Sequence, residues 1–359
     1  MTNPVYQPIF ELTRGDTVES IHNGAIAVVD VDGNLIASYG DPNAVTFLRS
    51  SAKPFQALPF FEHQGPSMFH LTSQEKAVIC ASHSGTDEHV AVVRSIQKKA
   101  RVDESELLCG VHEPYDEPTA DRLHELKELP TSNRHNCSGK HTGMLAYVRL
   151  KQHLGEQIPQ DLEYINPDHP VQKEILRTFA EMCDLPVGQV HLGTDGCSAP
   201  NFAVPLRNAA LAFARLCDPE GGAVLPSERA QACHAISTAM MASPEMIGGP
   251  GRFDTVLMQT VGEKIVSKAG AEAYQGIGLM PGALRPGSPA MGIVMKIADG
   301  DDRRKVRTAV ALEVLRRLGV LSNGELEMLA EFGPTYTLYN WRKITVGRAY
   351  PTFRLEHFE

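Results

Sequence analysis

The alternation of apolar and polar residues predicts strands near both ends of the chain. Residues 25–31 are rich in Ala, Val and Ile, Asp32-Gly33-Asn34 is a turn sequence, and residues 35–39 return as the second strand of a hairpin. Four later strands are predicted at 256–258, 265–267, 273–279 and 292–297. Strands contributed from both ends of the chain are expected to form one antiparallel sheet.

Helical periodicity fills the middle of the chain. Thr72 and Glu75 form a capping-box pair for a helix that ends near Cys80, and Pro54 suits the first turn of a helix running to about Glu62. Further helices are predicted at 87–100, 118–128, 142–153, 170–183, 205–217, 227–241 and 303–318.

These elements predict the α/β fold class, in its α+β form, with an antiparallel sheet packed against a helical block. The sequence contains neither internal repeats nor a low-complexity linker. We therefore expect residues 1–359 to form a single unit, with a sheet part from the N- and C-terminal segments and a helical part from the middle segment.

Composition excludes several classes of partner. Hydrophobic residues make up 42% of the chain, enough for a sizeable core, and the net charge of -9 argues against a general nucleic-acid binder. No apolar run approaches the ~20 residues that cross a bilayer, and the N-terminus lacks the pattern of a secretory signal. The seven cysteines show no disulfide framework, which fits reduced thiols and a cytoplasmic location without a membrane partner.

Ser50-Ser51-Ala52-Lys53 is a Ser-x-x-Lys sequence at a predicted helix start. Residues three apart share a helix face, so the Lys53 amine can reach the Ser50 hydroxyl. A serine becomes a strong nucleophile when a neighbour takes its proton, and a lysine does so where its surroundings lower its pKa. Backbone N–H groups at the helix start would stabilise an oxyanion. The alternative is a polar helix start with an exposed lysine, because this spacing is common by chance.

A second serine and a second lysine occur elsewhere in the chain. Ser82-His83-Ser84-Gly85 interrupts a helix, and it offers either a serine to the same cleft or a loop stabilised by serine side-chain turns. Lys268-Ala269-Gly270 ends a strand, as a similar Lys-Thr-Gly does opposite the Ser-x-x-Lys of serine β-lactamases and penicillin-binding proteins. The order of the two motifs favours a serine nucleophile.

Cys137 and Cys197 each lie in a polar segment that contains glycine. Two thiolates with His141 or Asp195 nearby would suit zinc, whereas the alternative is a pair of buried, inert cysteines. Four other cysteines lie among apolar helical residues and are expected in the core: Cys80, Cys183, Cys217 and Cys233.

Taken together, the motifs resemble the L-asparaginases of the Rhizobium etli type, the asparaginase II family that is unrelated to the common bacterial threonine enzymes. The resemblance extends over nearly the whole chain. The segments that carry it are residues 48–56, 81–85, 135–141, 195–197, 252–255 and 268–272.

The resemblance implies a fold similar to serine β-lactamases and glutaminases, a homodimer, and hydrolysis of L-asparagine to L-aspartate and ammonia. It implies two catalytic pairs, Ser50 with Lys53 and Ser82 with Lys268. In the mechanism we expect, Lys53 takes the Ser50 proton and Ser50 attacks the side-chain amide, while the second pair relays protons. Which of the two serines attacks is left open.

The resemblance also implies a zinc ion and a set of substrate-binding residues. The zinc ligands map to Cys137, Lys140 and Cys197, although spacing alone favours His141 over the lysine. The residues expected to face the substrate are Arg49, His141, Asp195, Gly196 and Glu272. Ala273 and Ser198 depart from the family pattern, which has glycine in many relatives at Ser198 and at the position of Ala273.

Three other functions fit parts of the pattern. A glutaminase differs only in the length of the substrate pocket. A β-lactamase or DD-peptidase relative shares the Ser-x-x-Lys and Lys-x-Gly order but usually acts outside the cytoplasm. A non-catalytic zinc-binding sensor would use the same cleft without chemistry.

Overall fold

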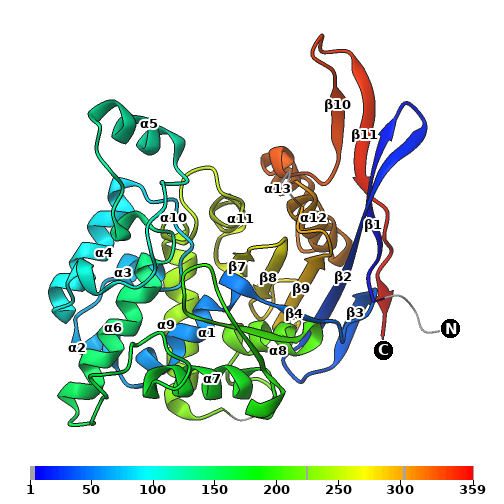
Figure 1. Ribbon diagram of the computed structural model, residues 1–359. Helices are drawn as coiled ribbons and strands as arrows, with labels where there is room; N and C mark the ends of the chain where they lie inside the picture. The colour runs from blue at the N-terminus through cyan, green and yellow to red at the C-terminus, as the bar shows by residue number, and fades with distance from the viewer. Residues whose placement is uncertain (1–4, 224, 302–304, 359) are drawn as a thin grey trace. The chain divides into compact units, whose positions relative to one another are not determined.

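The computed structural model describes residues 5–223, 225–301 and 305–358, and the chain divides into two compact units. Unit 1 comprises residues 1–51, 204–223 and 260–359, and unit 2 comprises residues 52–203 and 224–259. Unit 1 contains the main sheet, and unit 2 contains most of the helices (Figure 1). The expectation of a single unit over residues 1–359 stays a prediction.

The sheet of unit 1 is antiparallel at every pairing described. Its strands follow the order β10-β11-β1-β2-β9-β8-β7, and β3 pairs with both β2 and β12. The strands are β1 (Gln7–Arg14), β2 (Thr17–Asp30), β3 (Leu35–Tyr39), β7 (Ile265–Gly270), β8 (Tyr274–Leu279), β9 (Met291–Ile297), β10 (Tyr336–Tyr339), β11 (Thr345–Pro351) and β12 (Glu356–His357). N-terminal β2 lies beside late β9, with Gly24 opposite Ile297 and Asp30 opposite Met291. The predicted antiparallel sheet built from both ends of the chain is therefore confirmed.

Helix α8 (Leu206–Cys217) packs on strands β2, β8 and β9 of this sheet. The close approach requires glycine on the sheet. A Cβ atom at Gly292 would overlap the Ala210 carbonyl group, and one at Gly276 would overlap the Phe213 ring. Helix α12 (Val306–Leu318) packs against β1, β8, β9 and β11, and the shorter α13 (Asn323–Met328) follows it.

Unit 2 is a bundle in which α1 contacts α6, α7 and α9. Helix α1 begins at Lys53, next to Pro54, and every residue from Lys53 to Phe61 is buried. The helices of the unit are α1 (Lys53–Glu62), α2 (Gly65–Met68), α3 (Ser73–Ile79), α4 (Asp87–Ala100), α5 (Glu117–Leu126), α6 (Ser138–His153), α7 (Pro170–Met182), α9 (Ser227–Ala242) and α10 (Pro244–Ile247). Strands β5 (His191–Thr194) and β6 (Pro200–Pro205) pair antiparallel.

Local signals predicted most of these elements. The capping box of α3 is confirmed, since Thr72 Oγ1 accepts from Glu75 N at 3.3 Å and Thr72 N donates to Glu75 Oε2 at 2.6 Å. The strand predicted at 256–258 is wrong, because these residues lie in α11 (Phe253–Val261). A short apolar run does not distinguish a strand from a buried helix turn. The predicted start of the last helix at Arg303 lies outside the described residues.

No helix in the described ranges is long and apolar enough to cross a bilayer.

We predict that Gly292→Ala lowers the free energy of unfolding by about 1–3 kcal/mol, because the new methyl group meets helix backbone, which cannot rotate away. Urea unfolding followed by circular dichroism measures the change. Gly324→Ala is the matched control, since nothing lies within 4 Å of its Cβ position and alanine favours α13. Equal effects of the two substitutions would contradict the packing argument.

Candidate active site

The Lys53 amine is buried and is held by three acceptors. The residue is 1% exposed, and Nζ donates to Ser82 Oγ at 2.9 Å, to Ala81 O at 2.6 Å and to Asn136 O at 3.3 Å. A buried amine needs such partners, because desolvation without them costs several kcal/mol. The contact places a lysine nitrogen within proton-transfer distance of a serine hydroxyl.

Ser82 lies in the non-helical segment after α3, and the neighbouring His83 is fixed by hydrogen bonds on both sides of its ring. Nδ1 accepts from Gly85 N at 3.2 Å, so Nε2 carries the proton and donates to Ser138 Oγ at 2.9 Å. Burial holds the pKa of His83 well below its ordinary value, and the nearby His89 and Lys53 lower it further. This imidazole is therefore neutral beside the Lys53 amine.

His112 fixes the peptide that supplies the third acceptor of Lys53. Its Nε2 accepts from Asn136 N at 3.0 Å, and its Nδ1 lies 2.5 Å from the Glu113 carbonyl oxygen, which selects the Nδ1–H tautomer. The Asn136 carbonyl group is thereby oriented towards Lys53. Sequence reasoning missed His112, because it lies 24 residues before Asn136 in a loop without a motif.

The cysteine cluster lies at the start of α6. Cys137 precedes this helix, Lys140 is in its first turn, and Cys197 belongs to the turn between β5 and β6. All three side chains are buried, and Lys140 Nζ donates to Cys197 Sγ at 2.9 Å.

Charges in this cluster depend on one another. A hydrogen bond from Cys197 lowers the pKa of Cys137, and the amines of Lys53 and Lys140 help to outweigh the opposite effect of burial. Burial disfavours the charge on Lys140, but the sulfurs of Cys197 and Cys137 raise the pKa of Lys140 above its ordinary value. These shifts favour a thiolate at Cys137 and an ammonium group at Lys140. The Lys53 amine is among the groups that lower the pKa of Cys137, so the cysteine cluster lies close to the Lys53–Ser82 contact.

The donor atoms of this cluster suit zinc. The buried Nε2 of His141 has no hydrogen-bond partner among the described residues, although Cys197 is close enough to affect the pKa of the ring. Burial lowers that pKa to about 4. No three His, Cys, Asp or Glu side chains in the described ranges come together for a metal, so Lys140 would have to be the third ligand.

Asp195 and Gly196 lie in the same turn as Cys197. Asp195 Oδ1 accepts from Gly196 N at 2.9 Å, and its Oδ2 lies 3.8 Å from Cys197 Sγ. These two residues, which the resemblance assigns to the substrate, are therefore adjacent to the predicted metal ligands.

The remaining predicted site residues belong to unit 1. Ser51 Oγ donates to Lys268 O at 2.6 Å, which holds the turn containing Arg49 and Ser50 against β7. Arg49 Nη1 lies 3.9 Å from Glu272 Oε1. Lys268 is fully buried, and its amine donates to Ala269 O at 2.8 Å.

The predicted residues thus fall into two groups, one in each unit. Unit 2 brings together Lys53, Ser82, Cys137, Lys140, His141, Asp195, Gly196 and Cys197. Unit 1 brings together Arg49, Ser50, Lys268 and Glu272. The pairings of Ser50 with Lys53 and of Ser82 with Lys268 stay predictions; the Lys53–Ser82 contact is one that the sequence did not predict.

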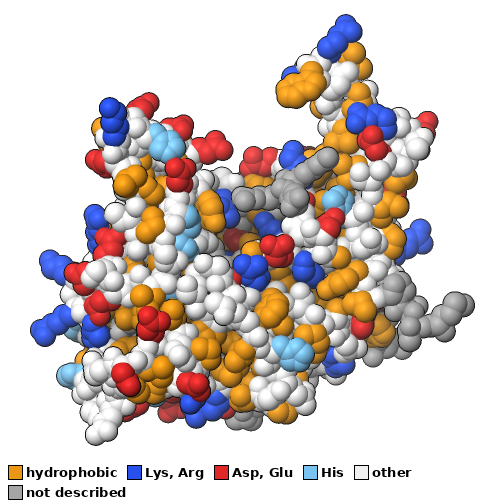
Figure 2. Space-filling model, in the orientation of Figure 1, with side chains coloured by type: hydrophobic (Ala, Val, Ile, Leu, Met, Phe, Trp, Pro, Cys, Tyr) orange, Lys and Arg blue, Asp and Glu red, His pale blue; other side chains and the backbone are white. Residues whose placement is uncertain are grey.

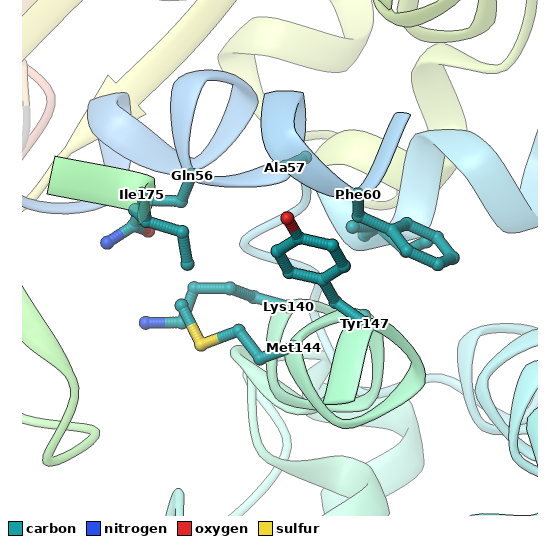
Figure 3. A pocket seen from close by; sticks show the side chains of 9 residues that line it. Gln56, Ala57, Phe60, Lys140, Met144, Tyr147 and Ile175 are labelled. Atoms are coloured by element: carbon teal, nitrogen blue, oxygen red, sulfur yellow. The ribbon is translucent and has the colours of Figure 1, made fainter. Parts of the chain in front are cut away.

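A small cavity lies beside Lys140 (Figure 3). Its lining is mostly apolar, with Phe60, Met144 and Ile175 among the wall residues and the stem of Lys140 at one side. Its polar wall atoms are already engaged, since Gln56 donates to Pro200 O and Tyr147 is bonded to His63. The cavity therefore offers little recognition for a polar substrate.

Both departures from the family pattern lie at residues with left-handed backbone. Ser198 has φ 71° and Ala273 has φ 52°. Glycine adopts this region without strain, whereas a Cβ atom makes it costly. Glycine at either position would relieve this strain.

A family model for L-asparaginase II matches residues 10–351. This match makes the chain an amidohydrolase, and its partly buried Lys53–Ser82 contact lies beside a cluster of thiols. It belongs to the asparaginase II family.

Glutaminases are among the solved structures to which the chain is similar. A probable glutaminase from Bacillus subtilis, complexed with 6-diazo-5-oxo-L-norleucine, is 15% identical, with 83% of this chain and 84% of that chain covered and a TM-score of 0.37. A Bacillus glutaminase is 13% identical, with 83% and 92% covered and a TM-score of 0.36. No curated protein sequence matches the chain.

We predict that Ser198→Gly raises the free energy of unfolding by about 0.5–1 kcal/mol, because glycine relieves the left-handed strain at an exposed position. Thermal unfolding measures the gain. Ser73→Gly is the control, since Ser73 is an exposed helical residue and glycine there should destabilise α3. A loss of stability in both variants would contradict the strain at Ser198.

Proposed function

We propose that the protein is an L-asparaginase of the Rhizobium etli type, which hydrolyses L-asparagine to L-aspartate and ammonia through a serine activated by lysine. Family membership supports the amide substrate. The observation that carries the mechanism is the 2.9 Å contact between the buried Lys53 amine and the partly buried Ser82 hydroxyl.

In the proposed reaction, a serine oxygen attacks the carbon of the side-chain carboxamide. The serine proton passes to a neutral Lys53 amine and then to the departing nitrogen, which leaves as ammonia. A water molecule then attacks the aspartyl ester, and Lys53 takes its proton and returns it to the serine oxygen. Atoms and protons balance, and free enzyme and aspartate remain.

The attacking serine is Ser50 or Ser82. In the form predicted from the sequence, Ser50 attacks and gives its proton to Lys53, while Ser82 and Lys268 relay protons or activate the water. The observed contact also fits direct attack by Ser82, because the lysine nitrogen already accepts or supplies a proton at that oxygen. Separate alanine variants distinguish the two forms.

Two charged residues that the sequence assigns to the substrate would orient the amino-acid part of asparagine. Arg49 would bind the α-carboxylate, and Asp195 would bind the α-ammonium group. Backbone N–H groups at the turn over Arg49–Ala52 would stabilise the oxyanion. His141, Gly196 and Glu272 would complete the substrate contacts, and Lys268 would assist proton transfer.

We propose that Cys137, Cys197 and Lys140 hold zinc. When bound, the ion would supply a positive charge that polarises or anchors polar groups of the substrate. Lys140 can ligate only as the neutral amine, so its proton must leave when the metal binds. The thiolate–ammonium pair of the metal-free cluster would then be replaced by metal–ligand bonds.

We further propose that the protein acts in the cytoplasm as a homodimer. The reducing compartment is supported by the seven cysteines, all of which are buried free thiols.

Lys53→Met is expected to lower kcat for ammonia release from L-asparagine by about 10²–10⁴-fold, because it removes the proton acceptor while keeping the bulk of the side chain. L-Glutamine serves as the competing substrate in the same assay. Lys98→Met, at an exposed site on α4, is the matched control and should retain activity.

Ser50→Ala and Ser82→Ala should show which serine is the nucleophile and which one relays protons. The variant that lacks the nucleophile loses acyl-enzyme formation, whereas the variant that lacks the relay forms it slowly. Full activity of Lys53→Met, or of both serine variants, would overturn the proposed mechanism.

Zinc content provides an independent test. Elemental analysis of protein purified with zinc should find about one ion per chain, and Cys137→Ser or Cys197→Ser should abolish it. Cys233→Ser, in the core of α9, is the control and should keep the metal. Equal zinc content in all three variants would refute the ligand assignment.

A further inference from the structure

The turn between β7 and β8 combines strained backbone with a residue predicted to face the substrate. Residues 271–273 connect the two strands. Glu272 has φ 56° and Ala273 has φ 52°, so two successive residues with side chains adopt left-handed backbone. Arg49, which lies near Glu272, is a third such residue, with φ 52°. Strained residues other than glycine cluster at functional sites, where the surrounding structure holds them in place.

The contact between Arg49 and Glu272 is too weak to hold the turn. Arg49 Nη1 and Glu272 Oε1 are 3.9 Å apart, and the Glu272 side chain is 67% exposed. Figure 2 shows acidic and basic side chains next to one another at several places on the surface, and exposed pairs of this kind contribute little to stability. The left-handed backbone therefore depends on other contacts.

The amine of Lys296 supplies one of those contacts. Lys296 lies on β9 and is 8% exposed, and its Nζ donates to Glu272 O at 2.5 Å and also to Ile297 O. The backbone of the next residue supplies another, because Ile297 N donates to Ala273 O at 3.2 Å. The carbonyl groups of both left-handed residues are thus bound by β9. Burial lowers the pKa of Lys296, and the nearby carboxylates of Glu272 and Asp299 oppose that shift.

A glycine leaves room for the carboxylate of Glu272. Gly300, with φ 83°, follows β9, and a Cβ atom there would lie 2.7 Å from Glu272 Oε2. Lys296 therefore fixes the backbone of Glu272, and the space at Gly300 admits its side chain.

We propose that Lys296 is a positioning residue for the reaction: it fixes Glu272, and Glu272 orients the Arg49 guanidinium group towards the α-carboxylate of the substrate. This role rests on the proposed function, which assigns Arg49 and Glu272 to the substrate. A guanidinium group carries five N–H donors, so it can bind a protein carboxylate and a substrate carboxylate together. Lys296 itself does not touch the substrate.

Lys296→Met removes the amine and keeps most of the bulk of the side chain. We expect KM for L-asparagine to rise about tenfold and kcat to change less than about threefold, because the weakened contacts bind a part of the substrate that does not react. Ammonia release by the full-length protein measures both constants. Lys264→Met is the matched control. It removes an exposed lysine just before β7, which pairs with Glu325, and it should leave KM unchanged.

A double-mutant cycle tests the connection through Arg49. In an Arg49→Met background, Lys296→Met should lower kcat/KM by less than about twofold, because the group that it positions is already absent. A full tenfold loss in both backgrounds would mean that Lys296 acts independently of Arg49, and it would contradict the proposal.

Gly300→Ala tests the same carboxylate without changing Lys296. The new methyl group displaces the flexible end of the Glu272 side chain, so KM for L-asparagine should again rise by about threefold or more. Gly282→Ala is the matched control, since Gly282 has φ 80° and nothing lies within 4 Å of its Cβ position. It therefore introduces the same backbone strain without the contact, and KM should not change.

Hydrogen exchange measured by mass spectrometry reports on the turn independently of activity. Peptides that contain residues 271–274 should exchange faster in Lys296→Met than in the unchanged protein, while peptides from α6 should not. Equal exchange at the turn would refute the role of the amine. Faster exchange with an unchanged KM, or with a loss of kcat alone, would make Lys296 a structural residue only. An unchanged protein that releases no ammonia from L-asparagine would instead refute the proposed function, and this role with it.

Discussion

The buried amine of Lys53 is the constraint that the arrangement of unit 2 satisfies. Its acceptors come from the segment after α3 and from the residue before Cys137, while the lysine itself begins α1. A polar group at this depth is stable only if its hydrogen bonds are made, so the three segments must meet at one point. The motif and the fold are therefore linked: the nitrogen that can exchange a proton with a serine also holds three parts of the chain together.

Electrostatics around this amine follow one pattern. The Lys140 amine helps to lower the pKa of Cys137, the sulfurs of Cys197 and Cys137 raise that of Lys140, and burial lowers the pKa values of the nearby histidines. Burial keeps the pKa of His83 well below its ordinary value and lowers that of His135 to about 3, and nearby positive groups lower both further. Protonation of these histidines is therefore disfavoured. The sulfur atoms and the backbone carbonyl oxygens stabilise the two lysine amines. A metal ion held by the sulfurs would alter this balance within reach of Lys53.

The sequence predicted the features that depend on neighbours along the chain. The Thr72–Glu75 capping box and the proline near the start of α1 specify their helices locally, and they were found. The apolar residues 256–258 gave no such local evidence, and the surrounding helix α11 was missed. Strands β1, β10 and β11 were also missed, because their stability depends on pairing between the two ends of the chain.

The same distinction holds for the site. The motifs identified Lys53, Ser82 and the cysteines, but their hydrogen bonds depend on tertiary structure, and neither the Lys53–Ser82 contact nor the role of His112 could be read from spacing. At residues 198 and 273 the sequence showed only a departure from the pattern expected of the family, and it did not predict left-handed backbone. The backbone angles show why a residue with a Cβ atom is strained there.

The most direct test of this account is covalent labelling by a diazoketone analogue of L-asparagine, followed by mass spectrometry of the digested protein. Such a reagent alkylates an activated oxygen and loses N2, while the serine proton passes to the diazo carbon. The account predicts one adduct per chain, on Ser50 or Ser82, and none when Lys53 is replaced by Met. An adduct on another residue, or undiminished labelling without the lysine amine, would contradict it.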